Sequence, residues 1–315
     1  MPGVDPIIDA PKTEGQPLQP VQPVHRVVDA HVHAFPDEVI ASRDDLVGRD
    51  HWFGHLYANP TALVTNDQDL LASMAASGVD HAMMCGFPWS DPGLCRLNND
   101  WMAAASAASN GRLSWLGIVV PADPSAPAEA ERCFGLGASG IGELNADGQG
   151  FDLTDQHGLA ALTATCAAAR RPILLHATEP VGHSYPGKGT ATPDRLLRFL
   201  AANQDLDVVL AHWGGGLPFY ELMPEVAGLC QRVRYDTAAS PYLYRHDILQ
   251  VAVGLVGPKR ILWGSDFPVL SQGRFLRRTL ATELDPDSQR LIVGGSAHET
   301  YRLPDQFTPQ GEAAR

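Results

Sequence analysis

The sequence lacks the features that would tie it to a membrane or to nucleic acid. No apolar run approaches the roughly 20 residues that a membrane helix requires. Lys and Arg number 23 against 36 Asp and Glu, and the resulting charge of −13 is spread along the chain with no basic block. This balance argues against nucleic acid or an anionic membrane as a partner. The charge says little about small substrates; the small-molecule substrate that we expect follows from the candidate site described below.

Cysteine is also scarce. The five cysteines are scattered, with no CxxC spacing, so neither a disulfide framework nor a thiolate zinc site is expected. Reduced, mostly buried thiols in a cytoplasmic protein are the better interpretation. The first 24 residues hold many prolines and lack the apolar core and basic start of a signal peptide. We expect residues 1–24 to be a flexible leader and residues 25–315 to form a single domain.

The chain does contain a regular alternation of apolar runs and helical stretches. Ala- and Leu-rich stretches with helical spacing cover residues 67–78, 154–170 and 192–203. The predicted strands are 26–31, 79–87, 113–120, 139–145, 172–177, 207–212, 232–238 and 260–266. Eight strand–helix alternations favour an α/β fold of the closed (β/α)₈ TIM-barrel type, distorted, with a doubly wound open sheet as the alternative.

The segment from residue 34 to residue 66, after the first predicted strand, is unusually long and aromatic. It contains His51, Trp52, Phe53, His55 and Tyr57. Such a cluster suits either a cap over the barrel mouth or a subunit interface, because aromatic side chains serve both uses. We expect a homo-oligomer, most simply a dimer.

His31 and His33, in the stretch VVDAHVHAF, are the most informative pair in the chain. Residues i and i+2 of a strand point to the same face, so both imidazoles can converge on one ion where the strand ends. Two neutral imidazoles suit Zn²⁺ or a similar transition metal, with Mn²⁺, Fe²⁺ and Co²⁺ as alternatives. Alternating histidines on a half-exposed strand are the ordinary explanation of such a pair.

Four further predicted strands end in a side chain that can bind a metal or transfer a proton. These are Glu143, His176, His212 and Asp266. A barrel brings the carboxyl ends of its strands to one rim, so the six side chains can form one centre holding one or two ions. Asp266 suits the double role of metal ligand and proton-transferring group.

Two of these residues have ordinary structural explanations. Glu143 could pair with Lys188 or Arg245, although the two glycines before it allow close approach to a neighbouring strand. His212 could simply precede a glycine turn that enters a helix near Pro218. Within the first strand, a buried Asp29 that orients a histidine or a backbone group is expected rather than a catalytic one.

Substrate-binding candidates come from the loops and from aromatic side chains near the strand ends. The aromatic candidates are Phe87, Trp89, Trp213 and Tyr242. Such side chains more often form the wall of a binding site than take part in the reaction. Polar candidates are His183, Tyr185, Lys188 and Arg245, whose positive charge could anchor a carboxylate or phosphate. The alternative is that Lys188 and Arg245 pair with Glu179, Asp247 or solvent.

Taken in order, the motifs DAHVH (29–33), LLHAT (174–178), LAHWGGG (210–216) and WGSDFP (263–268) resemble the amidohydrolase superfamily. The resemblance is to the amidohydrolase-related branch that includes the aminocarboxymuconate semialdehyde decarboxylase group, and it covers the chain from about Val27 to about Leu303. It implies a metal held by four residues, with His212 either a ligand or a group that polarises the scissile bond. The four implied ligands are His31, His33, His176 and Asp266.

The sequence departs from this branch at two positions. Decarboxylases of the branch usually have no acid at the end of the fourth strand, where Glu143 resembles the bridging Glu of two-metal hydrolases of the TatD type. Relatives more often have Asn at the position of Ser296. The first departure favours a hydrolase of a small amide, lactam, lactone or ester, with metal-activated water as nucleophile. A non-oxidative decarboxylase of a small unsaturated or aromatic acid is the alternative, and a non-catalytic binding barrel is a third possibility.

Overall fold

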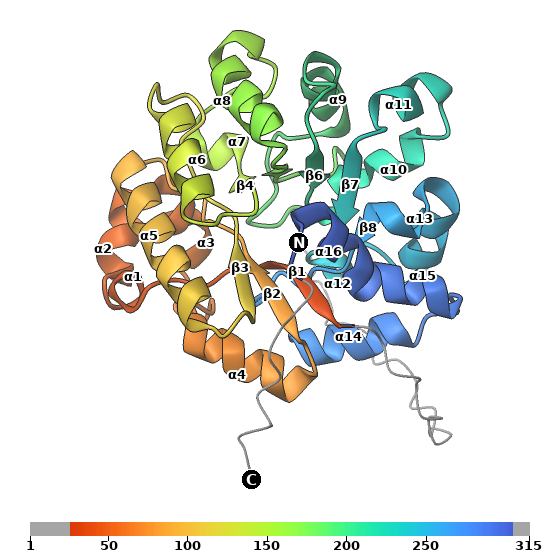
Figure 1. The fold of residues 1–315 in the computed structure, drawn as a ribbon, viewed down its shortest axis with the longest axis horizontal. Coiled ribbons are helices and arrows are strands. Elements are labelled where there is room, and N and C mark those ends of the chain that lie inside the picture. The colour runs from red at the N-terminus through yellow and green to blue at the C-terminus, as the bar shows by residue number, and fades with distance from the viewer. Residues whose placement is uncertain (1–25, 305–315) are drawn as a thin grey trace, which may run out of the picture.

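The structure, a computed structural model, describes residues 26–304. Eight short strands lie in the middle of the molecule and helices surround them (Figure 1). The strands are β1 (Val28–Val32), β2 (His81–Met84), β3 (Leu113–Trp115), β4 (Ile141–Leu144), β5 (Ile173–Leu175), β6 (Val208–Leu210), β7 (Val233–Asp236) and β8 (Ile261–Leu262). The predicted leader, residues 1–24, lies outside the described residues.

All ladder pairs between these strands are parallel. Strands β1 to β3 form one sheet and β4 to β8 another, each in chain order. Parallel bridges join the two sheets at both junctions, Gly117 to Ile141 between β3 and β4, and Val32 to Phe267 between β8 and β1. The predicted (β/α)₈ barrel is confirmed, and the open sheet is excluded by the contact between the first and last strands.

Seven of the eight predicted strands contain the observed one, and β1 runs one residue past the predicted range 26–31, but all the observed strands are shorter than predicted. The difference lies mainly at the carboxyl ends. Strands β5, β6 and β8 end before their polar residues His176, His212 and Asp266, whereas Glu143 still lies within β4. His212 and Asp266 have φ angles of 54° and 63°, in the left-handed region. These side chains therefore lie just beyond the strands, on the turns that follow them, at what we call the rim of the barrel; the opposite end is the base.

Helices fill the connections between strands. They are α1 (Asp37–Ala41), α2 (Arg43–Arg49), α3 (His51–Tyr57), α4 (Asp67–Ser77), α5 (Pro92–Ala108), α6 (Ala126–Gly135), α7 (Ala146–Gln149), α8 (Gln156–Ala169), α9 (Pro193–Ala202), α10 (Leu217–Tyr220), α11 (Pro224–Leu229), α12 (Ser240–Leu243), α13 (Ile248–Val256), α14 (Gln272–Leu280), α15 (Pro286–Arg290) and α16 (Ser296–Tyr301), with 3₁₀ turns at His212–Gly216 and Pro258–Arg260 and a π-helical turn at Leu291–Gly295. None of the helices within residues 26–304 is long and apolar enough to cross a membrane.

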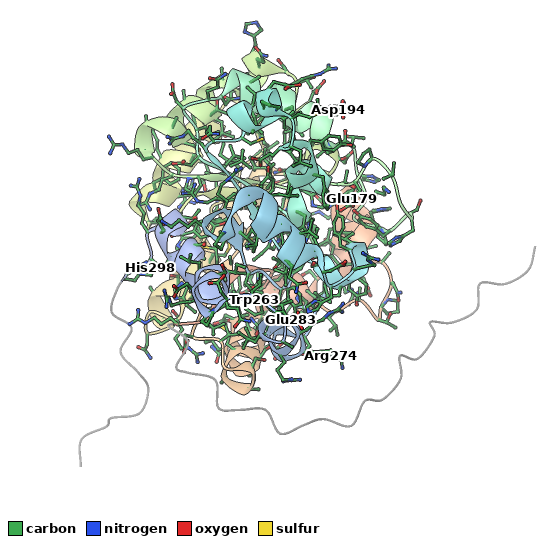
Figure 2. All side chains as sticks on the ribbon, turned by 90° about the vertical axis from the view of Figure 1, so that its right-hand side faces the viewer. Glu179, Asp194, Trp263, Arg274, Glu283 and His298 are labelled. Atoms are coloured by element: carbon green, nitrogen blue, oxygen red, sulfur yellow. The ribbon has the colours of Figure 1, made fainter. Side chains whose placement is uncertain are left out.

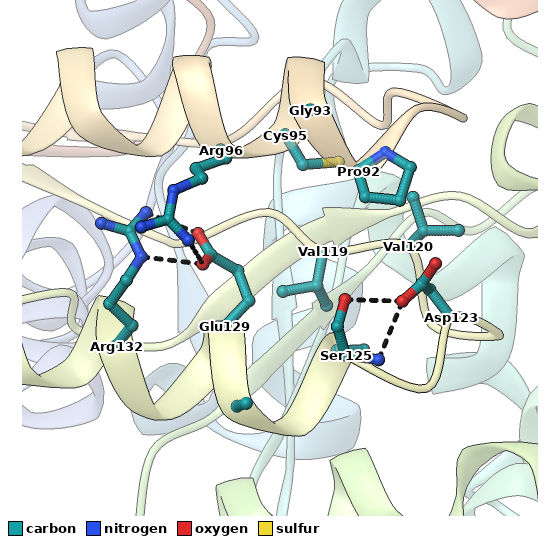
Figure 3. A pocket seen from close by; sticks show the side chains of 12 residues that line it. Pro92, Gly93, Cys95, Arg96, Val119, Val120, Asp123, Ser125, Glu129 and Arg132 are labelled. Carbon is teal, nitrogen blue, oxygen red and sulfur yellow. Dashed lines mark hydrogen bonds and ion pairs between the residues drawn. The ribbon is translucent and has the colours of Figure 1, made fainter.

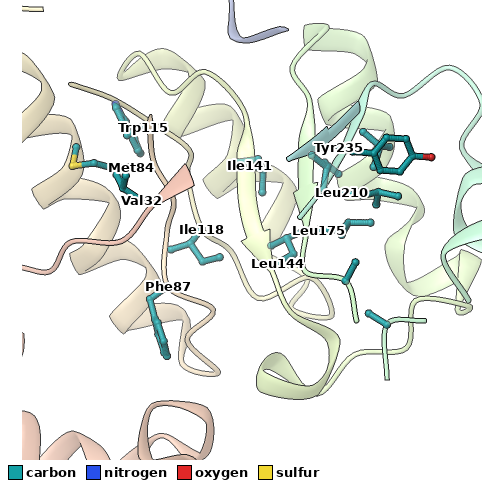
Figure 4. Close-up of a cluster of buried hydrophobic side chains, with 14 of the residues drawn as sticks. Val32, Met84, Phe87, Trp115, Ile118, Ile141, Leu144, Leu175, Leu210 and Tyr235 are labelled. Carbon is teal, nitrogen blue, oxygen red and sulfur yellow. The ribbon is translucent and has the colours of Figure 1, made fainter. Parts of the chain in front are cut away.

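The apolar core has two layers that follow the two faces of the strands. Met83, Leu174 and Val209 belong to an inner cluster, which Tyr301 of α16 joins at the base. Their chain neighbours point the other way, into the larger cluster between strands and helices, part of which Figure 4 shows. Period-two alternation of this kind, with both faces apolar, is what a strand buried on both sides requires. The five cysteines are all buried free thiols, as predicted.

The long segment after β1 folds into α1, α2 and α3 rather than an irregular loop. Asp50 begins α3 by accepting a hydrogen bond from Phe53 N, and its other carboxylate oxygen accepts from Ser90 N and Ser90 Oγ after β2. This link places Trp52 and Tyr57 over the rim. Of the two roles expected for the segment, that of a cap agrees with this position, and the subunit interface stays a prediction.

The rim and the base lie at opposite sides of the molecule. Figure 2, which looks across the barrel, shows His298 of α16 at one side and Glu179, in the loop after β5, at the other. The candidate site residues all come from the rim.

Candidate metal centre and active site

His31 and His33 converge at the rim with Asp266. The two Nε2 atoms are 3.1 Å apart, and Asp266 Oδ1 lies 3.7 Å from His31 Nε2 and 3.6 Å from His33 Nε2. All three side chains are buried. The left-handed turn at Asp266 lets its own N–H donate to His31 O at 2.9 Å, which fixes the carboxylate beside the β1 histidines.

A second group adjoins the first. Glu143, on β4, has its Oε1 2.8 Å from His176 Nδ1 and 3.3 Å from His212 Nε2. Its other oxygen lies 3.4 Å from His33 Nε2, so Glu143 lies between the two groups. The structure therefore brings together all six residues that the sequence predicts as metal ligands.

The glycines before Glu143 have the role that the sequence suggests. A Cβ at Gly140 would lie 2.5 Å from Pro172 O, and a Cβ at Gly142 would lie 2.4 Å from Leu174 O. Gly142 also has a φ of 142°. Any side chain at these positions would push β4 away from β5, and Glu143 away from His176.

Asp236, at the end of β7, holds two of the histidines and was missed in the sequence. Its Oδ2 lies 2.8 Å from His31 Nδ1, while its Oδ1 accepts from the backbone N–H groups of His212 and Ala238. A carboxylate on Nδ1 directs the lone pair of His31 Nε2 toward the cluster. The signal was available, because Asp236 stands near the end of a predicted strand just as the other rim residues do.

Backbone carbonyls fix the imidazoles of His212 and His176. His212 Nδ1 lies 3.1 Å from Ala238 O, and His176 Nε2 lies 2.8 Å from Gly187 O. A carbonyl can only accept, so each of these nitrogens donates, and the other nitrogen of each ring faces Glu143. Asp29, as expected, orients backbone and side chains, accepting from Ser265 and Gln272.

The electrostatics of the cluster are dominated by the contacts between acids and histidines. Burial alone would raise the pKa of Glu143, but His31, His176 and His212 around it hold that pKa well below its usual range. Burial alone would lower the pKa of His212, but its hydrogen bond to Glu143 and the charge of that carboxylate raise the pKa to about 9. The buried Glu143 carboxylate thus requires positive charge close to it.

The donor set fits a divalent cation. Lone pairs on His31 Nε2 and His33 Nε2, 3.1 Å apart, repel each other unless a proton or a cation lies between them. Imidazole nitrogens mixed with carboxylate oxygens suit Zn²⁺, Mn²⁺ and similar ions. A divalent metal is therefore supported, while the choice of zinc is not.

A cavity of about 380 Å³ opens onto this cluster. Its floor includes His33, Glu143, His176, His212 and Asp266, and its walls are largely apolar. Of the predicted substrate-binding residues, Phe87, His183, Tyr185 and Tyr242 line it. Aromatic and aliphatic wall residues that the sequence did not single out for binding are Trp52, Leu56, Tyr57, Leu243 and Val269. Trp52, Leu56 and Tyr57 belong to the cap. The aromatic composition of that segment was the only sign in the sequence that it would line the cavity.

Four predicted substrate-binding residues do not line this cavity. Trp89 and Trp213 are fully buried behind it, where their indole N–H groups donate to Asn98 Oδ1 and Ser240 Oγ.

Lys188 and Arg245 are also engaged elsewhere. Lys188 Nζ donates to the carbonyls of Val181 and His183 in its own loop, and Arg245 pairs with Asp247 at 2.6 Å. Both side chains already have partners and neither lines the cavity, so the anchoring of an anionic group by these two cations stays a prediction. Glu143 does not pair with them either.

A larger cavity, of about 520 Å³, lies away from the cluster, between α5 and α6 (Figure 3). Its charged groups neutralise one another, since Glu129 pairs with both Arg96 and Arg132. Asp123 accepts from Ser125 Oγ and N. None of the metal-ligating groups within residues 26–304 faces it.

The amidohydrolase family model matches residues 28–303. The chain belongs to the amidohydrolase family. The resemblance read from the four motifs is thereby confirmed. No curated protein matches the sequence.

Solved structures of the same fold include several decarboxylases. 5-Carboxyvanillate decarboxylase from Sphingomonas paucimobilis superposes with a TM-score of 0.74 at 19% identity, covering 89% of this chain and 99% of its own. 2,6-Dihydroxybenzoate decarboxylase from Rhizobium gives a TM-score of 0.69 at 20% identity over 88% and 99% of the two chains. Dihydroxybenzoic acid decarboxylase from Polaromonas sp. JS666, solved with manganese and 2-nitroresorcinol, gives 0.66 at 17% identity over 88% and 97%.

These comparisons overturn the prediction of a hydrolase. These three proteins, which share the fold over nearly their whole length, are decarboxylases, and decarboxylation was the stated alternative. The prediction failed because it gave too much weight to Glu143. A carboxylate at this position also serves to orient His176, as the 2.8 Å contact shows, and so does not by itself specify hydrolysis.

Proposed function

We propose that this protein is a metal-dependent, non-oxidative decarboxylase of a small aromatic carboxylic acid. The observation that carries the proposal is a cavity whose floor is a cluster of metal-ligating side chains and whose walls are aromatic. Trp52, Tyr57, Phe87 and Tyr242 suit a flat ring, since aromatic pairs favour offset-stacked or edge-to-face contacts. The decarboxylase neighbours support the same reaction class.

We propose that the cation is held by His31, His33, His176 and Asp266, with Glu143 and His212 as either further ligands or hydrogen-bonding partners. When bound, a divalent cation neutralises and orients the acidic end of the substrate. Because one of the structural neighbours was solved with manganese, Mn²⁺ is to be tested beside Zn²⁺. A dimeric state and a cytoplasmic location also stay predictions.

Asp266 is our candidate for the proton donor. Decarboxylation replaces the ring's carboxylate by hydrogen, so a proton must reach the carbon that bears it. In the proposed step, the Asp266 carboxylate takes up a proton from water in the cavity and then transfers this proton to that carbon. The ring–carboxylate bond then breaks, its electron pair restores the aromatic ring, and CO₂ leaves. Asp266 faces the cavity, and His212 on the same floor is placed to orient the departing carboxylate.

The test is a turnover assay on protein reconstituted with Mn²⁺ or Zn²⁺. The substrates are 2,6-dihydroxybenzoate, 5-carboxyvanillate and related hydroxybenzoates, with CO₂ and the decarboxylated arene measured separately. A matched panel of lactones and amides is scored for hydrolysis. We expect CO₂ and arene in equal amounts from at least one aromatic acid. Hydrolysis without CO₂ release, or no binding of any aromatic acid by metal-loaded protein, contradicts the proposal.

A further inference from the structure

A second cavity adjoins the candidate active site at the rim. It has a volume of about 300 Å³ and lies between the loop after β5 and helices α10 and α12. His183, Tyr185 and Leu243 line both cavities, so these three side chains form the wall between them. We call this space the side cavity.

Glu179 supplies a carboxylate to the side cavity, and Figure 2 labels it at the rim. Its Oε2 accepts a hydrogen bond from the Tyr185 hydroxyl at 2.8 Å. Its Oε1 is buried and has no hydrogen-bond partner among the described residues. Lys188, in the same loop, donates to backbone carbonyls instead, as described above. Within residues 26–304, no Lys or Arg forms an ion pair with Glu179.

The surroundings of this carboxylate are mostly apolar. Burial, the charge of Glu179 and a hydrogen bond to that residue all raise the pKa of Tyr244, so the Tyr244 hydroxyl lies beside the carboxylate, while Glu179 Oε1 still has no partner among the described residues. Phe219 packs beside Tyr244, with ring centroids 6.2 Å apart. A Cβ at Gly216 would come within 3.2 Å of the Tyr244 hydroxyl, so the lack of a side chain there keeps the space open.

An unpaired carboxylate oxygen buried beside apolar walls is costly, because burial removes water without supplying another donor. Native structures rarely leave such an atom without a partner, and a ligand group is a common one. A carboxylate accepts hydrogen bonds and repels anions. The side cavity therefore selects a ligand group that donates.

We propose that the side cavity is a subsite for the part of the substrate remote from the reacting carboxylate, and that this part ends in a hydroxyl or amino group which donates to Glu179 Oε1. The inference rests on the proposed function. It narrows the substrate class from aromatic acids in general to aromatic acids with an arm that passes His183 and Tyr185 and ends in a donor.

The test compares binding and turnover of matched aromatic acids by metal-loaded protein. One series carries a short arm that ends in a hydroxyl or amino group. The other carries arms of equal length that end in methyl, and the parent acid has no arm. Calorimetry gives Kd for each. We expect the wild type to bind the best donor-terminated acid at least about tenfold more tightly than its methyl counterpart, as for a hydrogen bond to a charged group.

Variants of Glu179 separate the role of the carboxylate from general packing. Glu179→Ala should abolish the preference for donor-terminated arms, and Glu179→Gln, which keeps the size but not the charge, should lose the amino preference more than the hydroxyl preference. Glu225→Gln removes an exposed charge from α11 and should retain the wild-type preference. Circular dichroism checks that each variant is folded.

The outcomes distinguish the two proposals. Turnover of the parent acid without any donor preference overturns the subsite and leaves the decarboxylase standing. A preference that survives both Glu179 substitutions also overturns the subsite. If no acid of either series binds or releases CO₂, the proposed function fails, and a substrate subsite fails with it.

Discussion

Buried histidines occur at both ends of the barrel, and their surroundings differ. At the base, His81 of β2 has Nδ1 3.0 Å from Gly111 O and Nε2 3.0 Å from Ser114 Oγ. The carbonyl accepts and the hydroxyl donates, so a neutral imidazole satisfies both contacts. At the rim, His31 and His33 present nitrogens to each other and to carboxylates. Burial of a histidine therefore does not by itself indicate a functional site. A site is indicated where several imidazole nitrogens and carboxylate oxygens converge on one point.

The largest expected effect at the rim is that of Asp266→Asn. A carboxamide cannot deliver the proton, so kcat for CO₂ release should fall by about 10³-fold, within the range for general acid catalysis. Metal content, measured by plasma mass spectrometry, shows whether the variant also loses its cation. Asp247→Asn, which breaks only a surface ion pair, is the matched control. A kcat within a few fold of the wild type would remove Asp266 from the reaction.

At the base, His81→Gln should change the pH dependence of stability. Burial lowers the pKa of His81 to about 4, below its unfolded value of 6.5. As pH falls from 6.5 to 4 the unfolded chain takes up a proton that the folded protein does not, so His81 lowers stability progressively in this window.

The quantity to measure is the difference in free energy of unfolding between wild type and His81→Gln. By linkage, the wild type should lose up to about 3 kcal/mol of stability relative to His81→Gln between pH 7 and pH 4. Urea unfolding at several pH values of protein freed of metal gives this difference. A constant difference across the range would show that His81 titrates normally in the folded state.

Glu143→Gln tests how far the two groups at the rim depend on one another. Removing the charge between four imidazoles should weaken metal binding by about 10- to 100-fold, the usual cost of losing a ligand-orienting partner. Competition with a chromogenic chelator measures the affinity. Full metal affinity together with full activity would limit Glu143 to a structural role.

The smallest effect is expected for Arg245→Ala. The Arg245 side chain is 88% exposed and, among the residues that the structure describes, pairs only with Asp247, a contact worth less than about 1 kcal/mol. KM for the best aromatic acid should be unchanged, as should the melting temperature. A large rise in KM would return this cation to the binding site and weaken the comparison drawn above.

Much of this arrangement could be predicted from the sequence, because it depends on local pattern and on the topology of a barrel. Apolar runs ending in His, Glu or Asp indicated both the strands and the rim. The directions of individual side chains could not be predicted. Lys188 and Arg245 stand in rim loops, but nothing local shows that carbonyls or a neighbouring Asp already bind them. Trp213 follows a rim histidine, yet the left-handed turn directs its indole inward to Ser240.

The reaction itself was the hardest part to predict. A glutamate near two histidines serves equally as a bridging ligand and as a hydrogen-bonding partner, and the spacing in sequence is the same for both. The whole-chain comparison with solved decarboxylases favours the alternative reaction, and the turnover assay decides between the two.

The position of His31 and Asp266 has a consequence for folding. The two residues are far apart in the sequence. The hydrogen bond from Asp266 N to His31 O joins the first strand to the turn after the last one. A cation held by both would close a loop that includes almost the entire barrel. Bringing the two ends of so long a loop together costs entropy, and in the folded barrel this cost has already been met. In a partly folded chain the ion would have to meet it, so the ion would bind weakly to such forms. Metal affinity would then depend on how completely the barrel has formed.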